Sequence, residues 1–187
     1  MKTDLTVVNV VGTGQLPTKV NYENVMNRVD SVNFRYDPSI HQGLELRLEE
    51  EGPLITIYNT GKYIIRAQSV ELLYEVRKSF LELMRSINLL ESDSDKEFNI
   101  NNVVCSGNIG RELKLEALVE DLGGGDTSYE PDQFPGVVYK PRDQSCSILI
   151  FRSGKVVITG APDVETAKSG FQSLNEKISE LISSDTQ

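Results

Sequence analysis

The sequence is poor in the residues that carry most catalytic and metal chemistry, with one histidine, two cysteines and no tryptophan among 187 residues. A zinc site of the usual kind needs about four ligands, most of them His or Cys, and His41, Cys105 and Cys146 are too few and too scattered. A Ser-His-Asp or Cys-His site would have to use His41. We therefore predict no enzyme activity, no metal and no cofactor.

Long apolar runs are also missing. A membrane-spanning helix needs about 20 consecutive apolar residues, and the longest run here is only a few residues. Residues 1–12 make a poor signal peptide, because an aspartate precedes their short apolar run. The cysteines have no CxxC spacing and no secretory context, so a reducing cytoplasm is the expected location.

Positive charge is in short supply, since 19 Lys and Arg face 28 Asp and Glu, for a net charge of -9. Nucleic-acid binders are usually basic, because neutralising phosphates supplies much of their affinity. Composition alone therefore argues against a nucleic-acid partner. An acidic surface also fits a salty cytoplasm, where charge is screened over a few ångströms.

What the sequence does have is an internal repeat at an offset of 93 residues. Identical residues recur at this spacing, including Asn9 and Asn102, Pro38 and Pro131, and Gly61 and Gly154. The match slips by one residue near Ser69. The acidic segment 91–97 reads as a linker, so we expect one repeat in residues 1–90 and a second in residues 98–187.

Each copy predicts the same order of elements. A strand over residues 5–11 or 98–104 precedes a short helix with apolar residues at helical spacing. Four strands punctuated by glycine and proline follow, and a long amphipathic helix closes each copy. This order predicts an α+β fold in which helices cover one side of an antiparallel sheet.

The other side of that sheet is not polar. Side chains alternate between faces along a strand, yet both phases of residues 147–159 are largely apolar. An uncovered apolar face indicates a partner surface, unless the two repeats stack face to face as a sandwich. Lys62, Arg66 and Lys155 lie on the uncovered phase. Because unpaired lysine is rare in a core, a ligand-facing surface with anion contacts is favoured.

Two runs of the second copy carry a family resemblance. Residues 129–139 read YEPDQFPGVVY and residues 149–161 read LIFRSGKVVITGA. With Asn102-Val103-Val104 before them, they make the chain resemble archaeal TATA-box-binding proteins over residues 5–182. The resemblance implies a pseudo-two-fold saddle of two β-α-β-β-β-β-α repeats. Its curved ten-stranded antiparallel sheet would carry four helices on the convex face and bind the DNA minor groove with the concave face.

For the second copy, the resemblance implies that Phe134 and Phe151 wedge between base steps and kink the duplex. It implies that Asn102 donates hydrogen bonds to the acceptors of the A·T minor groove. The implied groove-floor residues are Val104, Leu149, Val157 and Thr159, and the implied phosphate contacts are Arg152 and Lys155.

The first copy departs from the family pattern. It keeps four of the implied DNA-contacting positions, Asn9, Val11, Lys62 and Ile64. Tyr58 and His41 stand in place of the wedging phenylalanines, and Arg66 in place of the groove-floor threonine. Ala67-Gln68 stands where the second copy has Gly160-Ala161, and Glu49–Glu51 would place acids near the DNA rim. These replacements predict an altered or relaxed site preference.

The sequence thus favours a transcription initiation factor that binds and bends TATA-like promoter DNA. The resemblance implies that Glu130, Asp132 and Gln133 dock transcription factor B, which would link the protein indirectly to RNA polymerase. An archaeal source would place it in the cytoplasm, associated with the nucleoid, and a homodimer in the absence of DNA stays open. The alternative is an adaptor of the same fold that binds transcription factors and reads DNA weakly or with altered specificity.

Overall fold

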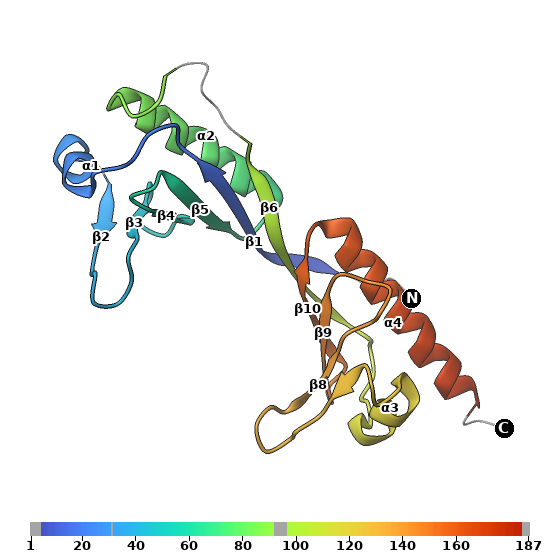
Figure 1. Ribbon diagram of the computed structural model, residues 1–187. Coiled ribbons are helices and arrows are strands. Elements are labelled where there is room, and N and C mark those ends of the chain that lie inside the picture. Colours follow the sequence, from blue (N-terminus) through green and yellow to red (C-terminus); the bar gives the residue numbers. More distant parts are fainter. Residues whose placement is uncertain (1–4, 31, 92–96, 185–187) are drawn as a thin grey trace. The chain divides into compact units, whose positions relative to one another are not determined.

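The computed structural model describes residues 5–30, 32–91 and 97–184 (Figure 1). Its element order is β-α-β-β-β-β-α, twice over, as the repeat predicts. Most of the predicted linker, residues 92–96, lies outside the described residues. Nowhere in the described ranges is a helix both long and apolar enough to cross a membrane.

The first repeat contains five strands and two helices. They are β1 (Thr6–Gln15), α1 (Tyr22–Arg28), β2 (Asn33–Arg35), β3 (Leu44–Arg47), β4 (Leu54–Ile57), β5 (Lys62–Ala67) and α2 (Val70–Ser86). The second repeat contains β6 (Asn99–Asn108), α3 (Leu115–Leu122), β7 (Thr127–Ser128), β8 (Gly136–Tyr139), β9 (Ser147–Phe151), β10 (Lys155–Ala161) and α4 (Val164–Ser184). The leading strand of each repeat extends beyond its predicted end at Val11 or Val104.

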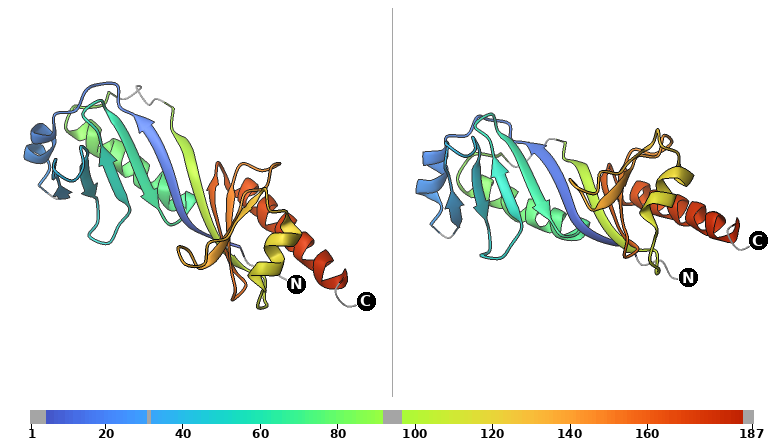
Figure 2. Two further views of the ribbon diagram at one scale, coloured as in Figure 1. Left: turned by 60° about the horizontal axis from the view of Figure 1, so that its bottom comes forward. Right: turned by 90° about the horizontal axis from the view of Figure 1, so that it is seen from below.

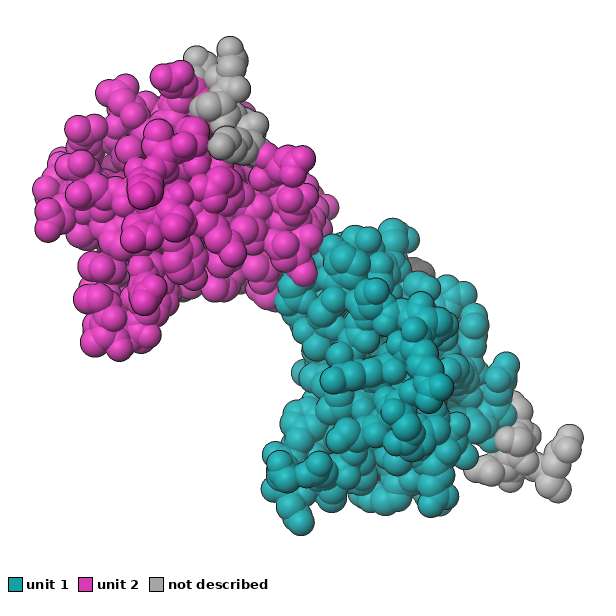
Figure 3. Space-filling model, in the orientation of Figure 1, with its two compact units in different colours: residues 1–8, 102–187 teal, residues 9–101 magenta. Residues whose placement is uncertain are grey.

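All ten strands belong to one sheet in the order β2-β3-β4-β5-β1-β6-β10-β9-β8-β7. The predicted fold class is confirmed, and the alternative of two stacked sheets is not realised. The chain forms two compact units, residues 9–101 and residues 1–8 with 102–187 (Figure 3). We call these units the first half and the second half.

A long helix packs on one face of the strands in each half, α2 on β5 and α4 on β10 (Figure 2). Beneath α2, the rings of Tyr63 and Phe80 lie 4.9 Å apart between centroids. In each half a glycine makes room for an aromatic ring. A Cβ on Gly14 would fall 2.2 Å from the Tyr63 ring, and one on Gly107 would fall 2.9 Å from the Phe171 ring of the second half. The apolar stripes of the long helices therefore form the two cores, as their periodicity predicts.

The last strands of the two halves differ by one residue. Val10 pairs with Ala67 in the first half, whereas Val103 pairs with Ala161 in the second. The register of β10 shifts between Ile158 and Ala161, which marks a β-bulge. Before its paired alanine the first half has one residue, Arg66, where the second half has two, Thr159 and Gly160. The expectation that Ala67-Gln68 replaces Gly160-Ala161 is therefore wrong, because Ala67 occupies the place of Ala161 and the first half lacks the bulge.

Candidate nucleic-acid interface

The face of the strands opposite α2 and α4, here called the open face, is only half-buried. Buried and half-buried residues alternate over residues 9–14 of β1 and 102–107 of β6, and β9 and most of β10 show the same period. The predicted groove-contacting residues fall on this half-buried phase, namely Asn9, Val11, Ile64, Asn102, Val104, Leu149, Val157 and Thr159. Both halves therefore present a partly solvated sheet face on which a partner can lie.

In the second half, the middle of the open face is apolar. The strand registers place Val138 opposite Leu149, and Leu149 opposite Val157. All three side chains are half-buried. They form a smooth row across β8, β9 and β10, with Ser128 and Ser106 at its two ends. Such a row suits the floor of a minor groove, where few polar groups distinguish one base pair from another.

Phe134 and Phe151 meet beside this row. Their ring centroids are 5.6 Å apart and the rings are inclined at 62°. Gly136 forms the seat of the pair, because a Cβ there would lie 2.9 Å from the Phe134 ring and 3.1 Å from the Phe151 ring. Both rings are half-buried. The pair that sequence predicts as a wedge is thus assembled and partly exposed.

Asn102 is held by the bulge in β10. Its side-chain oxygen accepts a hydrogen bond from the backbone N–H of Gly160, 2.8 Å away. Gly160 has φ of +77°, the left-handed conformation that glycine adopts without strain. Since only the amide oxygen can accept this hydrogen bond, the NH₂ group stays free to donate. That orientation suits a groove floor that offers acceptors.

Cations and acids flank the second half. Lys155 is exposed at the start of β10, and Arg152 is exposed on the preceding turn, 3.4 Å from Glu116. Both members of that ion pair are about two-thirds exposed, 67% and 66%, so the pair is weak and Arg152 can exchange it for another anion. The exposed residues Glu130, Asp132 and Gln133 form a turn closed by a hydrogen bond from the Phe134 N–H to the Glu130 carbonyl.

The open face of the first half is polar instead. The row equivalent to Ser128, Val138, Leu149 and Val157 consists of Arg35, Glu45, Thr56 and Ile64. Thr56 is fully buried, and its hydroxyl accepts a hydrogen bond from Arg66, 3.0 Å away. Arg47 donates to the carbonyl of Gly52. Sequence reasoning missed Arg35, Glu45 and Thr56, although comparing Glu45 with Val138 and Thr56 with Leu149 would have revealed the exchange of apolar for polar residues.

The predicted wedge positions of the first half do not mirror Phe134 and Phe151. The imidazole of His41 accepts a hydrogen bond at Nδ1 from the backbone N–H of Gly43 and lies 3.1 Å from Glu45 through Nε2. Tyr58 lies near Tyr22 instead. Burial raises the pKa of Tyr22, and the hydroxyls of Tyr36 and Tyr58 raise it further. The ring contact that links Tyr22 and Tyr36 is edge-on, at 4.9 Å.

Asn9 occupies the position of Asn102 without its support. Because the bulge is missing, no backbone N–H takes the place of Gly160, and the described part of the chain provides no hydrogen-bond partner for the Asn9 side chain. The two strand asparagines, which look equivalent in sequence, are therefore oriented in one half and free in the other.

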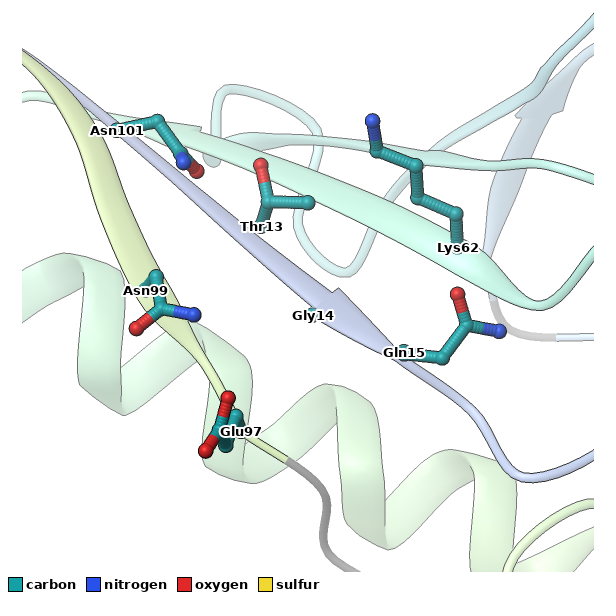
Figure 4. Close-up of a pocket in the computed structure, with 7 residues that line it drawn as sticks. All are labelled: Thr13, Gly14, Gln15, Lys62, Glu97, Asn99 and Asn101. Atoms are coloured by element: carbon teal, nitrogen blue, oxygen red, sulfur yellow. The ribbon is translucent and has the colours of Figure 1, made fainter.

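A pocket of about 660 Å³ lies at the end of β1 in the first half (Figure 4). Its lining comes from β1, β5 and the start of β6, and comprises Thr13, Gly14, Gln15, Lys62, Glu97, Asn99 and Asn101. Lys62 reaches it from the open face. No group of three or more His, Cys, Asp or Glu that could hold a metal ion occurs among the described residues.

The family model described as transcription factor TFIID (or TATA-binding protein, TBP) matches residues 4–87 and again residues 97–181. The chain belongs to the TATA-binding protein family. TATA-box-binding protein C of Halobacterium salinarum is 41% identical over 177 residues, which cover 94% of this chain and 98% of that protein. The TATA-box-binding protein of Methanothermobacter thermautotrophicus is 34% identical over 181 residues, or 95% and 96% of the two chains.

A solved structure of the TATA-binding protein family has the same fold. The TATA-binding protein of Methanococcus jannaschii superposes with a TM-score of 0.79 at 30% identity, covering 95% of this chain and 99% of that one. The family consists of TATA-box-binding transcription factors, and the predicted resemblance is confirmed. The residues that contact DNA or transcription factor B in this member stay predictions.

Proposed function

We propose that this protein is a transcription initiation factor that binds TATA-like promoter DNA in the minor groove through its open face. It bends the duplex with Phe134 and Phe151 and recruits transcription factor B through Glu130, Asp132 and Gln133. It acts without a cofactor and reaches RNA polymerase indirectly. The relatives named as TATA-box-binding proteins support the DNA target.

The assembled Phe134–Phe151 pair carries this proposal. Two aromatic rings 5.6 Å apart, seated on a glycine and half-exposed beside an apolar row, have no role in the core beneath α4. Apolar side chains of this kind unstack base steps when they enter the minor groove. Burying several hundred Å² of apolar surface at about 25 cal/mol per Å² contributes several kcal/mol. That contribution offsets the unfavourable net charge of -9.

The test is binding to a fluorescent TATA-containing duplex, measured by anisotropy, with a G·C-rich duplex of equal length as the control. We expect tighter binding to the TATA duplex, with Phe134→Ala and Phe151→Ala each abolishing the bend measured by gel mobility. Absence of binding at every salt concentration would refute the proposal.

Recruitment of transcription factor B is tested separately, by a supershift of the protein–DNA complex. Charge removal in the turn, through Glu130→Ala with Asp132→Ala, should abolish the supershift and leave DNA binding intact. Glu120→Ala removes an exposed acid from α3 and serves as the matched control. An unchanged supershift in the double variant would show that the turn is not the docking site.

The adaptor alternative is favoured by one observation, the polar row Arg35, Glu45, Thr56 in the first half. An adaptor would bind transcription factor B without DNA and show no preference between the two duplexes. The same anisotropy and supershift measurements therefore separate the two functions.

A further inference from the structure

We infer that the first half meets DNA without driving a side chain between base pairs, so that a bound duplex is kinked only where it faces Phe134 and Phe151. This inference rests on the proposed function, because it concerns how the two halves share the work of DNA binding. It assigns a polar, cation-bearing contact to the first half and the kink to the second.

The backbone that would present a wedge is the same in both halves. The N–H of His41 donates to the Asp37 carbonyl at 3.0 Å, and the N–H of Phe134 donates to the Glu130 carbonyl at 2.8 Å. The first turn is fixed further by Ser39, whose hydrogen bonds lower the pKa of Asp37. The difference between the halves therefore lies in the side chains at the end of this turn.

Both ring nitrogens of His41 are hydrogen-bonded, one to the backbone just before β3 and the other to a side chain of β3. Nδ1 lies 2.7 Å from the backbone N of Gly43, which can only donate, so Nδ1 is unprotonated and Nε2 carries the hydrogen. Nε2 then donates to Glu45 at 3.1 Å. Moving the ring between two base pairs would break both hydrogen bonds and leave the Glu45 carboxylate beside the DNA without its partner. Phe134 makes no hydrogen bond that such a movement would break.

The strands β3 and β4 beside His41 also lack the apolar support that β8 and β9 give the wedge in the second half. Where Val138 and Leu149 flank the phenylalanines, the first half has Glu45 and Thr56. The Thr56 side chain, rather than a second aromatic ring, lies against Gly43, where an added Cβ would fall 2.6 Å from its methyl group. Desolvating the Glu45 carboxylate against base edges would cost free energy that the apolar row does not incur.

Cations replace the wedge on this half. Arg35 and Arg66 are exposed on its open face where the second half holds Ser128 and Thr159, and Lys62 is kept in both halves, as Lys155 in the second. Arg66 keeps one hydrogen bond to Thr56, which fixes its direction across β4 and β5. Guanidinium and ammonium groups contact phosphates and groove acceptors without unstacking bases. The first half can therefore hold the duplex without kinking it.

One kink gives the site a direction. Flexible pyrimidine–purine steps reduce the cost of kinking, so such a step is required only where DNA faces the second half. The half-site facing the first half is then selected by phosphate contacts and groove width instead. A promoter element would bind this protein preferentially in one orientation for this reason.

The experiment measures the bend of a TATA-containing duplex, labelled with a donor and an acceptor dye at its ends, by energy transfer at saturating protein. Phe134→Ala with Phe151→Ala should return the transfer efficiency to that of free DNA. His41→Ala with Tyr58→Ala should leave the efficiency of the complex at the wild-type value, whatever its effect on affinity. His41→Phe with Glu45→Val rebuilds an apolar wedge and should raise the efficiency above wild type.

The outcomes separate this inference from the proposed function. If the wild-type protein binds and bends the duplex, and the His41 and Tyr58 alanines reduce the bend as much as the phenylalanine changes do, the single kink is wrong and the proposed function stands. If the wild-type protein binds no DNA, both fail. Thermal melting checks that each variant is folded, and His41→Ala alone repeats the test with one mild change, since that side chain is 35% exposed.

Discussion

The backbone N–H of Gly160 donates a hydrogen bond to the side-chain oxygen of Asn102, 2.8 Å away. This contact joins a bulge in β10 to the neighbouring strand β6 and leaves the Asn102 NH₂ group facing out. It exists only because the bulge adds one residue, which the first half does not have.

Replacing Asn102 by Asp should weaken binding to a TATA duplex. The carboxylate can still accept from Gly160, but it has no donor for the groove and places a negative charge against acceptors. Loss of such a hydrogen bond costs about 1–3 kcal/mol, and anisotropy would measure it. Asn175→Asp adds the same charge on α4, which packs on the other face of the strands, and should bind like wild type. Equal affinities of the two variants would contradict the role of Asn102.

Gly160→Ala should destabilise the fold through the backbone alone. A Cβ at Gly160 meets nothing within 4 Å, but φ is +77°. The left-handed conformation costs an alanine about 1–2 kcal/mol, and about 1 kcal/mol lowers Tm by roughly 2–4 °C in a chain of this size. Gly124→Ala is the control, because its Cβ also meets nothing and its φ is not left-handed. Identical melting curves for the two variants would show that the bulge tolerates a side chain.

Gly136→Ala should impair DNA bending by displacing the wedge. The new Cβ would lie 2.9 Å from Phe134 and 3.0 Å from the carbonyl oxygen of Ile150, so the phenyl ring has to move. Overpacking of this kind costs about 1–3 kcal/mol. Gly43→Ala makes the equivalent change in the first half and should retain the bend. Energy transfer on the labelled duplex compares them, and a normal bend with Gly136→Ala would argue against the assembled pair as the kinking element.

The two cysteines should resist alkylation in the folded protein. Cys105 is fully buried and Cys146 is 8% exposed, and burial raises the pKa of both thiols. A raised pKa leaves less of the reactive thiolate at neutral pH, so labelling by iodoacetamide should require unfolding. Mass spectrometry with and without urea would detect the difference, and rapid labelling of Cys105 in buffer at pH 7 would contradict its burial.

The sequence predicts the fold well because it carries the pattern twice. Positions such as Gly14 and Gly107 recur because each must admit an aromatic ring, Tyr63 from β5 in one case and Phe171 from α4 in the other. Steric requirements of this sort are local, and each one restricts its position to a particular residue type that the sequence shows. The ends of the leading strands were less predictable, since Gly12–Gln15 looks like a turn by composition and is strand by pairing with β5.

The site was predictable in its second half and less so in its first. Phe134, Phe151 and Asn102 fall on the open face as expected. The ties of His41 to Gly43 and Glu45 depend on side-chain geometry across a turn, which no periodicity reveals. In the sequence, the missing bulge shows only as a one-residue slip of the repeat alignment near Ser69. Strand pairing shows in addition that the first half lacks the counterpart of Gly160, the residue that orients Asn102.

The division of the chain into compact units has a consequence for synthesis. Residues 1–8 belong with residues 102–187, and Leu5 lies close to Gly107 within that unit. Residues 1–8 thus leave the ribosome well before residues 102–187, and their unit cannot close until those later residues have been made. The intervening residues 9–101 need no such wait, so they can fold first. The folded unit then connects residues 1–8 to residues 102–187 along the chain.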